Sequence, residues 1–344
     1  MVEFAVGVCR RSPRRSPRRI EQLVLRVRRS LQRDSALGEY GAEAIHRELA
    51  ARGRRPLPAV RTIGRILERC GALDGRRRVR RQAPPPGWYL ARLAQRHAEL
   101  DSFDIIEDLV IRGGQAVNVL TGISLHGALC GAWPAESVTA RFAVESLLAH
   151  WREFGLPAYA KFDNDTVFQG AHQFPDKFGR VTRLCLALGV TPVFAPPLRR
   201  GFQADIEGFN GRWERKVWER YRFPSRADVI DRSGRFVAAH RDRHAVRIED
   251  APARRPFPDP WKLDLQAPLH GTVIYVRETN SRGQVVVLGH RFEGCSTWCR
   301  RLVRAEADLS RGQIRLYALR RRDPHRHQLL ATHPYDPPRV RFQE

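Results

Sequence analysis

The stretch ELDSFDIIEDLVIRGGQAVNVLTGISLHGALCGA, residues 99–132, decides the fold of the central part of the chain. It holds three short runs rich in β-forming residues, and Gly-Gly and Gly-Ile-Ser separate them, as in a three-strand meander. Apolar residues at helical spacing follow over 137–154, and AYAKFD (158–163) is typical of a buried strand. A further helix, a strand at 190–196 and a long helix over about 204–221 complete the pattern. The order β-β-β-α-β-α-β-α predicts a mixed sheet flanked by helices.

Three acidic residues lie where this topology would bring them together. Asp101 lies on the first strand, Asp163 ends the fourth strand, and Glu207 lies in the first turn of the long helix, at the edge of its apolar stripe. Oxygen ligands without imidazole or thiolate select Mg²⁺ or Mn²⁺. Two such ions can activate a water or a 3′-hydroxyl for an in-line displacement at a phosphodiester.

The charge of the chain points to a polyanionic partner. Lys and Arg number 61 and Asp and Glu 37, a formal net charge of +24, and basic side chains that contact phosphates release condensed counterions. No apolar run reaches the roughly 18 residues of a membrane span, and the six cysteines form no disulfide framework. We therefore expect a soluble protein of a reducing compartment, such as the cytoplasm, that binds nucleic acid.

The N-terminal region carries more than half of the excess charge. Residues 1–82 hold 22 arginines and 8 acidic residues. The Pro-punctuated segment RRSPRRSPRRI (10–20) is of low complexity, so we interpret 1–35 as an extended basic arm. A disordered tail with incidental charge is the alternative.

Residues 36–74 show two short amphipathic segments across a tight turn, as in a helix-turn-helix. EYGAEAIHRELAARG stops at Gly53, and PLPAVRTIGRILERCG has apolar residues at helical spacing and a C-cap glycine. The second helix would then present four residues to a DNA groove: Arg61, Thr62, Arg65 and Arg69. An ordinary helical hairpin with a solvated basic face is the alternative.

The remaining boundaries follow from composition. GRRRVRRQAPPPG indicates a linker, which we place at 75–95. The α/β region spans 96–225, and a helix and a second linker, rich in Arg, Asp and Pro, span 226–268. From 269 to 335 the pattern is entirely β and predicts a small β-barrel of about five strands.

The three acidic motifs resemble a known family. Asp101, FDND around Asp163, and Q-x-x-I-E-x-F-N around Glu207 look like the D, DN and E motifs of retroviral-type integrase cores and related DDE transposases. The match extends through EDLVIRGGQAVNVLTGISLHG and FQGAHQFPDKFGRVTRLCLALGVTPVFAP. These stretches are similar to a bacterial insertion-sequence branch, and the resemblance covers roughly residues 36–330. It implies an RNase H-like fold for the core.

Carried over residue by residue, the resemblance makes Asp101, Asp163 and Glu207 the catalytic, metal-binding triad. Asn164 would orient Asp163, and Asn210 would lie beside the active site. Two carboxylates depart from the family pattern, because Asp165 replaces the usual glycine after DN and Asp205 lies within the pair that precedes the glutamate.

More than one residue is a candidate for the first acid of the triad. Asp104 and Asp108 lie on the same segment as Asp101. We place Asp101 first because it fits the gapless spacing to Ser124 better.

The implied activity is Mg²⁺-dependent cleavage of transposon ends and strand transfer into target DNA, with Mn²⁺ as a possible substitute. Double-stranded DNA is the expected partner, and a homo-oligomer is expected because two transposon ends must be joined. Relatives usually carry a further helix-turn-helix segment at the N-terminus, so a truncation by frameshift or a misplaced start is an open alternative. An inactive or domesticated remnant that only binds DNA is the second function considered. A nuclease acting on RNA–DNA hybrids is the third, and the helix-turn-helix and terminal barrel disfavour it.

Overall fold

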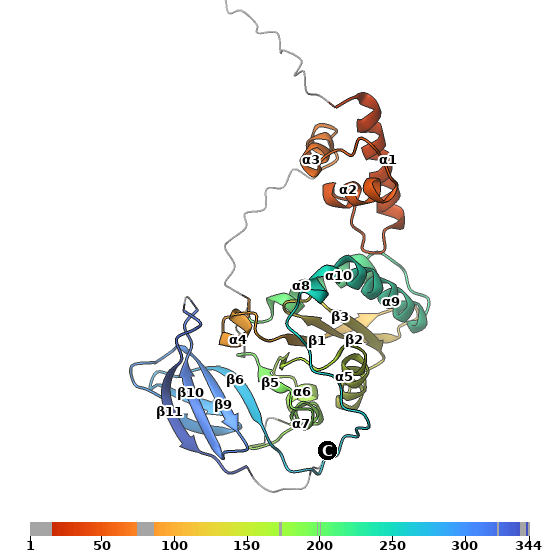
Figure 1. The fold of residues 1–344 in the computed structure, drawn as a ribbon. Helices are drawn as coiled ribbons and strands as arrows, with labels where there is room; N and C mark the ends of the chain where they lie inside the picture. Colours follow the sequence, from red (N-terminus) through yellow and green to blue (C-terminus); the bar gives the residue numbers. More distant parts are fainter. Residues whose placement is uncertain are drawn as a thin grey trace, which may run out of the picture. The chain divides into compact units, whose positions relative to one another are not determined.

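The computed structural model describes residues 16–73, 86–171, 174–197, 199, 201–321, 323–337 and 342. It divides into two compact units, Met1–Arg81 and Gln82–Glu344 (Figure 1). Each unit has a hydrophobic core of its own.

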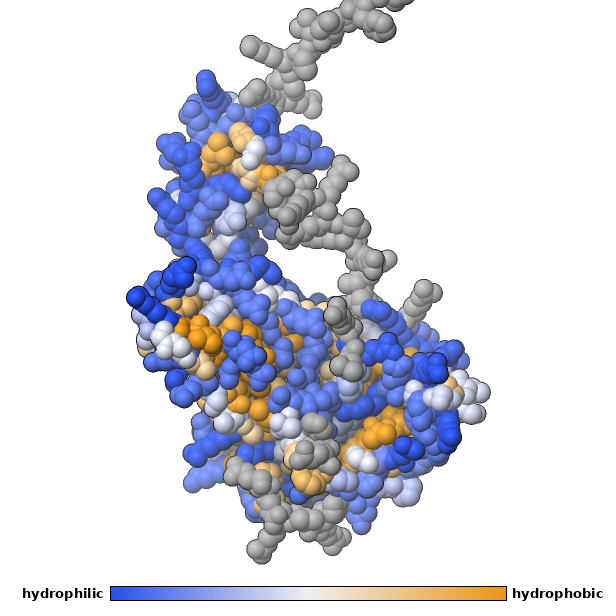
Figure 2. Space-filling view, turned by 180° about the vertical axis from the view of Figure 1, so that it is seen from behind, coloured by the Kyte–Doolittle hydropathy of each residue, from blue (hydrophilic) through white to orange (hydrophobic). Residues whose placement is uncertain are grey.

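The first unit is a three-helix domain built from α1 (Arg18–Asp34), α2 (Ala42–Ala51) and α3 (Val60–Arg69). Its core is made by seven buried apolar residues from all three helices, namely Val24, Val27, Ile45, Leu49, Ile63, Ile66 and Leu67. Hydrophilic side chains cover most of the face of this unit seen in Figure 2. The basic residues therefore lie on a folded helical scaffold.

Helix α1 corrects the prediction of an extended arm over 1–35. Val24 and Val27 repeat at helical spacing with the half-buried Leu31, and this stripe packs on the other two helices. The prediction rested on the high arginine content of this segment and did not take the apolar helical spacing into account. Residues 1–15, the rest of the predicted arm, lie outside the described residues.

The connection between α2 and α3 is longer than the predicted tight turn. It runs from Arg52 to Ala59, and Gly53 adopts a positive φ of 64° directly after the C-cap of α2. His46 of α2 hydrogen-bonds the carbonyl of Pro58 at 2.9 Å, which fixes the loop against the helix.

The second unit contains the predicted mixed sheet. Strands β1 and β3 both pair antiparallel to β2, whereas β4 pairs parallel to β1 and β5 parallel to β4. The order is therefore β3-β2-β1-β4-β5, the arrangement of an RNase H-like core, which confirms the expected fold class. The strands are β1 (Leu100–Val110), β2 (Ala116–Ser124), β3 (Cys130–Ala135), β4 (Tyr159–Phe162) and β5 (Thr191–Phe194).

Helices cover both faces of this sheet (Figure 1). On one face lie α5 (Ala140–Phe154), α6 (Thr166–Gln169) and α7 (Arg180–Ala187). On the other lie α8 (Ala204–Trp213), α9 (Arg226–Arg243) and α10 (Ala245–Glu249). The helix predicted over 204–221 is α-helical only to Trp213, and a π-helical turn, Glu214–Trp218, follows.

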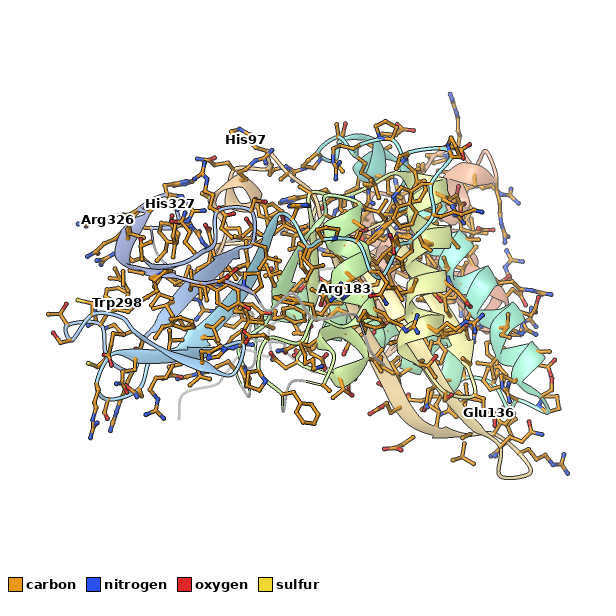
Figure 3. The ribbon with its side chains drawn as sticks, turned by 90° about the horizontal axis from the view of Figure 1, so that it is seen from below. His97, Glu136, Arg183, Trp298, Arg326 and His327 are labelled. Atoms are coloured by element: carbon orange, nitrogen blue, oxygen red, sulfur yellow. The ribbon has the colours of Figure 1, made fainter. Side chains whose placement is uncertain are left out.

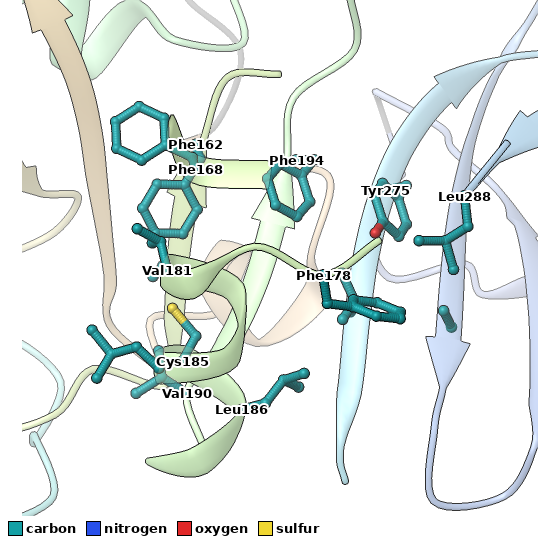
Figure 4. Packing of buried hydrophobic residues seen from close by; sticks show 14 of the residues in the cluster. Phe162, Phe168, Phe178, Val181, Cys185, Leu186, Val190, Phe194, Tyr275 and Leu288 are labelled. Carbon is teal, nitrogen blue, oxygen red and sulfur yellow. The ribbon is translucent and has the colours of Figure 1, made fainter. Parts of the chain in front are cut away.

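Aromatic rings from successive elements form the core beneath α6 and α7. Phe162 of β4 stacks on Phe168 of α6 at 4.9 Å between ring centroids, and Phe194 of β5 stacks on Tyr275 at 5.2 Å (Figure 4). Val181 and Cys185 of α7 are fully buried above these rings. Because Tyr275 lies beyond residue 269, the core of the α/β region includes part of the predicted barrel.

The C-terminal strands extend the sheet of the core. β6 pairs parallel to β5, and β9, β10 and β11 continue antiparallel from β6, which gives one nine-stranded sheet in the described residues. Figure 3 shows Trp298, Arg326 and His327 at the end of the unit formed by these strands, and Glu136 at the opposite end. The elements are β6 (Thr272–Glu278), β7 (Gln284–Val287), β8 (His290–Glu293), β9 (Leu302–Asp308), β10 (Gln313–Ala318) and β11 (Gln328–Pro334). The region has six strands where about five were predicted, and β7 and β8 form a separate hairpin.

Part of the predicted linker 75–95 is folded. Trp88, Tyr89 and Leu90 are buried, and α4 (Ala91–Ala94) follows them. They pack against Phe202, which precedes α8. The segment 86–95 thus belongs to the second unit, and 75–85 lies outside the described residues.

Candidate active site

The alternation of β1 divides its acidic residues between two faces of the sheet. Trp151 of α5 donates from Nε1 to Asp101 Oδ2 at 3.1 Å, so Asp101 faces α5. Ser102 donates to Asp205 of α8 at 2.5 Å, so Ser102 faces α8. Successive residues of a strand point to opposite faces, and Asp104 therefore shares the α8 face with Ser102.

Asp101 is the centre of a buried ion pair. Its side chain is 2% exposed and forms a salt bridge with Arg254, which also donates to the carbonyl of Gly155 at 3.1 Å. A carboxylate that accepts hydrogen bonds from Trp151 and Arg254 inside the protein compensates the buried guanidinium charge. The structure thus places Asp101 in an ion pair that faces α5, whereas Glu207 of the predicted triad lies on α8. Asp101 is the strand partner of Ser124 on β2, but register does not by itself tell which face a side chain occupies.

Asp104, the alternative first acid, lies on the face of β1 that contacts α8. Burial, together with the negative charges of Asp163 and Glu207, raises the pKa of Asp104 to about 7. These three carboxylates come from β1, the end of β4 and the first turn of α8, the elements expected from the sequence. The structure therefore brings Asp163 and Glu207 into electrostatic contact with Asp104.

Asn210 holds the carboxylate of Asp104 from α8. Its Nδ2 donates to Asp104 Oδ2 at 2.8 Å, and its Oδ1 accepts a hydrogen bond from Thr121 of β2 at 2.7 Å. The Thr121 contact fixes which end of the amide faces Asp104. The prediction that Asn210 lies beside the site agrees with these contacts.

Asp163 lies in the turn that follows β4. Its Oδ1 accepts a hydrogen bond from the backbone N–H of Asp165 at 2.9 Å, and burial, followed by the charges of Asp165 and Glu107, raises its pKa. Glu107 lies next to a β-bulge at Asp108, where φ is 58°. The extra residue of a bulge shifts the alternation of side chains, and the sequence pattern contained no sign of it.

Asn164 turns away from Asp163. Its Nδ2 donates to the carbonyl of Ala195 after β5, and its Oδ1 accepts from Arg277 of β6, both at 2.8 Å. The side chain therefore ties β4 to β5 and β6. The prediction that it orients Asp163 is not met by these contacts.

The two carboxylates that depart from the family pattern have partners within the protein. Asp165 is the N-cap of α6 and accepts from the N–H of Val167 at 2.7 Å. Asp205 pairs with the buried Lys161 at 2.8 Å. Both carboxylates are thus held by neighbouring groups.

The donor chemistry of Asp104, Asp163 and Glu207 suits a divalent cation. All three are oxygen donors, and a cation would offset the burial and the carboxylate repulsion that together raise the pKa of Asp104. Among the described residues, no group of three His, Cys, Asp or Glu side chains is close enough together to hold one metal ion. The donors fit Mg²⁺, but they are not gathered around one point.

The four candidate DNA contacts on α3 differ in their surroundings. Arg61 and Arg65 are exposed on one face of the helix, and Thr62 is half-buried. Arg69 forms an ion pair with Glu21 of α1 at 2.5 Å. Arg61 and Arg65 thus lie on the solvent side of α3, whereas Arg69 connects two helices.

Solved structures of retroviral integrases resemble this chain. The catalytic core of BIV integrase is 15% identical, with a TM-score of 0.30 over 42% of this chain and 81% of its own. The HTLV-2 integrase core in complex with magnesium is 10% identical, with a TM-score of 0.30 over 47% and 86%. A simian T-cell lymphotropic virus intasome, in complex with a PP2A regulatory subunit, is 13% identical, with a TM-score of 0.36 over 84% and 92%. No protein-family model and no curated protein matches the chain.

None of the helices in the described part of the chain is both long and apolar enough to span a membrane.

Proposed function

We propose that this protein is a Mg²⁺-dependent DDE-type DNA transposase or integrase of the bacterial insertion-sequence kind. The observation that carries the proposal is the pKa of Asp104, which burial, together with the negative charges of Asp163 and Glu207, raises to about 7. Three carboxylates on β1, β4 and α8 of an RNase H-like sheet suit phosphodiester cleavage and strand transfer. The sequence resemblance supports the same reaction.

In this proposal Asp104, Asp163 and Glu207 hold the metal ions. When bound, Mg²⁺ or Mn²⁺ would activate the attacking hydroxyl and stabilise the leaving oxygen of the phosphodiester. Asn210 keeps an oxygen of Asp104 aimed at the site through its 2.8 Å hydrogen bond. The backbone N–H of Asp165 holds Asp163 in the same way. Side chains fixed in this manner reduce the reorganisation that catalysis requires.

Double-stranded DNA is the proposed substrate. The net charge of +24 favours binding to phosphates, and the three-helix unit would place α3 in a groove as a helix-turn-helix does. Arg61 and Arg65 are the residues most exposed for this role. We further propose a homo-oligomer that holds two transposon ends in the cytoplasm; the simian virus structure that resembles this chain is itself an intasome.

A protein that binds DNA without cutting it is the second candidate. The exposed Arg61 and Arg65 lie in a unit that folds around its own core, so binding by α3 needs none of the three acids. An inactive remnant of a transposase would retain this unit.

The test is nicking of a labelled duplex that carries the terminal inverted repeats flanking the gene, with Mg²⁺ or Mn²⁺. Asp104→Asn and Asp163→Asn are compared with Asp108→Asn. Asp108 is exposed on the same segment as Asp104 and has a φ of 58°, a conformation that asparagine tolerates. Asp108→Asn is therefore the control variant: it makes the same change from carboxylate to amide at a residue outside the proposed site.

Metal-dependent nicking at the repeat boundary by the wild type and Asp108→Asn, and its loss in the other two variants, would support the transposase. Equal DNA binding without cleavage by all four proteins would instead support the DNA-binding remnant. Loss of cleavage in Asp108→Asn alone would contradict the assignment of Asp104.

A further inference from the structure

A buried lysine lies on β4, two residues before Asp163. The side chain of Lys161 on β4 is 2% exposed, and its Nζ donates to Asp205 Oδ1 and to the carbonyl of Phe202, both at 2.8 Å. The ring of Tyr89 lies 5.8 Å from the ammonium. Asp205 Oδ2 accepts a hydrogen bond from Ser102 of β1 at 2.5 Å. Lys161, Asp205 and Ser102 form one network, which we call the lysine network.

Each member of the lysine network precedes one proposed metal ligand by two residues. Ser102 precedes Asp104 on β1, and Lys161 precedes Asp163 at the end of β4. Asp205 precedes Glu207 in the first turn of α8. Ser102 and Lys161 are direct partners in the parallel β1–β4 pair, and Asp104 shares the face of Ser102 because residues two apart on a strand point to the same face.

The network is also the connection between the start of α8 and the sheet. The N-cap residue of α8, Gln203, makes no capping hydrogen bond with its side chain. Lys161 instead holds this end from β4, through the carbonyl of Phe202 and the carboxylate of Asp205. Glu207 is exposed on the same first turn, so its position relative to Asp104 and Asp163 depends on where that turn is held.

A contribution to stability alone does not account for this arrangement. Removing an ammonium from water is costly, and a buried ion pair often contributes no more than apolar side chains of similar size. An ion pair that also accepts a hydrogen bond from a hydroxyl group does, however, fix the directions and lengths of the contacts between the elements that it joins. The three contacts join the three elements that carry the acids.

We propose that Lys161, Asp205 and Ser102 are positioning residues that fix α8 against β1 and β4 and so set the affinity of the acidic site for divalent cations. This inference rests on the proposed function, because it concerns the same three acids. The residues act through the backbone and do not contact the metal or the DNA.

The decisive variant is Lys161→Met combined with Asp205→Asn. It removes both charges together, so neither remains buried without a partner, and the amide oxygen introduced by Asp205→Asn can still accept from Ser102. The control is Asp101→Asn combined with Arg254→Met, which neutralises the buried ion pair on the opposite face of β1. Ser102→Ala is a milder variant that removes one hydrogen bond and leaves the charge pair intact.

Three quantities are measured for the full chain with Mn²⁺: binding of the ion by calorimetry, the Mn²⁺ concentration at half-maximal nicking, and the midpoint of urea unfolding. We expect the Lys161/Asp205 variant to need at least tenfold more Mn²⁺ at an unfolding midpoint close to that of the control. Ser102→Ala should need two- to fivefold more. The Asp101/Arg254 control should bind Mn²⁺ as the wild type does.

Wild-type Mn²⁺ affinity in Ser102→Ala and in the Lys161/Asp205 variant would overturn the inference and leave the proposed function intact. If the double variant does not fold, Ser102→Ala decides by the same criterion. An equal loss of affinity in the Asp101/Arg254 control would also overturn it, because any buried pair would then suffice. A wild type that neither binds Mn²⁺ nor nicks DNA would refute the proposed function and the inference with it.

Discussion

Asp101 and Asp104 lie three residues apart on one strand and have opposite environments. Asp101 faces α5 and neutralises Arg254, whereas Asp104 faces α8 and is subject to the negative charges of Asp163 and Glu207. The carboxylate of Asp101 is therefore paired with a positive charge, whereas the carboxylate of Asp104 is repelled by two other carboxylates. This difference leads to opposite expectations for the two neutral variants.

We predict that Asp101→Asn lowers the free energy of unfolding by about 3–5 kcal/mol, because Arg254 remains in its buried position without a counter-charge. Asp104→Asn removes a repelled carboxylate and keeps an acceptor for Asn210, so it should leave stability unchanged or raise it. Urea unfolding at pH 8 in the presence of EDTA measures both changes. A loss of stability in Asp104→Asn larger than that in Asp101→Asn would contradict the two roles.

The sequence offered three candidates for the first acid and favoured Asp101, whereas the contacts with α8 favour Asp104. The preference for Asp101 rested on the sequence spacing between Asp101 and Ser124, and the two residues are strand partners in β1 and β2. The choice depended on which face of the sheet α8 covers, and that is a property of the whole fold. Asp163, Glu207 and Asn210 were named from their positions in the motifs of the family that the sequence resembles.

At the scale of elements, the lysine network could not be predicted from the sequence. Lys161 lies in an otherwise apolar strand, and Asp205 appeared only as a departure from the family pattern. Their contact joins residues 44 positions apart, which local periodicity does not describe. The strand and helix that carry them were predicted, since those depend on local apolar spacing.

Helix α3 gives a prediction at the same scale. Arg61→Ala combined with Arg65→Ala should weaken DNA binding and reduce the slope of log affinity against log salt by about 2, if each arginine contacts one phosphate. The protein should remain as stable as the wild type, because both side chains are exposed. Binding isotherms between low and moderate salt, measured with the terminal repeat duplex, test this.

Arg69 provides the contrasting variant on the same helix. Arg69→Ala breaks the ion pair with Glu21, which is mostly buried in α1. We expect it to destabilise the three-helix unit by about 1 kcal/mol or more, with a smaller change in the salt slope than the Arg61/Arg65 variant shows. A full unit of salt slope lost in Arg69→Ala, at unchanged stability, would show that Arg69 contacts DNA directly.

At the scale of the whole molecule, two buried histidines make the second unit sensitive to acid. Burial lowers the pKa of His150 on α5 and of His240 on α9 to about 3. Neighbouring His244 and Arg212 add to the effect at His240. Both histidines are neutral in the folded state, and they gain protons near pH 6.5 once the chain unfolds. Their contribution to stability is present above pH 6.5 and is lost as the pH falls toward 3.

We therefore predict that the wild type loses about 2 kcal/mol of stability for each of these histidines between pH 7 and pH 5. His240→Met should reduce that loss by about half while changing stability little at pH 7. Urea unfolding of the wild type and the variant at the two pH values gives the comparison. An unchanged dependence on pH in His240→Met would show that His240 does not remain neutral in the folded protein.

The relation between the core and its C-terminal strands gives the last prediction. Composition placed a separate barrel at 269–335, because strands and turns alternate there. The pairing of β6 with β5 depends on where the chain returns to the sheet, and composition does not report that. Val193 and Phe194 of β5 pair with Ile274 and Tyr275, and Tyr275 stacks on Phe194. The strands after residue 269 thus complete the core.

A chain that ends at residue 268 should therefore fail to fold, since it loses the partner of β5 and exposes the edge of a central strand. A chain that begins at residue 82 should fold, because it retains the whole second unit. Soluble yield, circular dichroism and the cooperativity of thermal unfolding distinguish the two. A cooperative transition in the chain ending at 268 would mean that the last strands form an independent domain. The three acids would then be positioned without the C-terminal strands. The remaining role of those strands at the site would be to bind DNA.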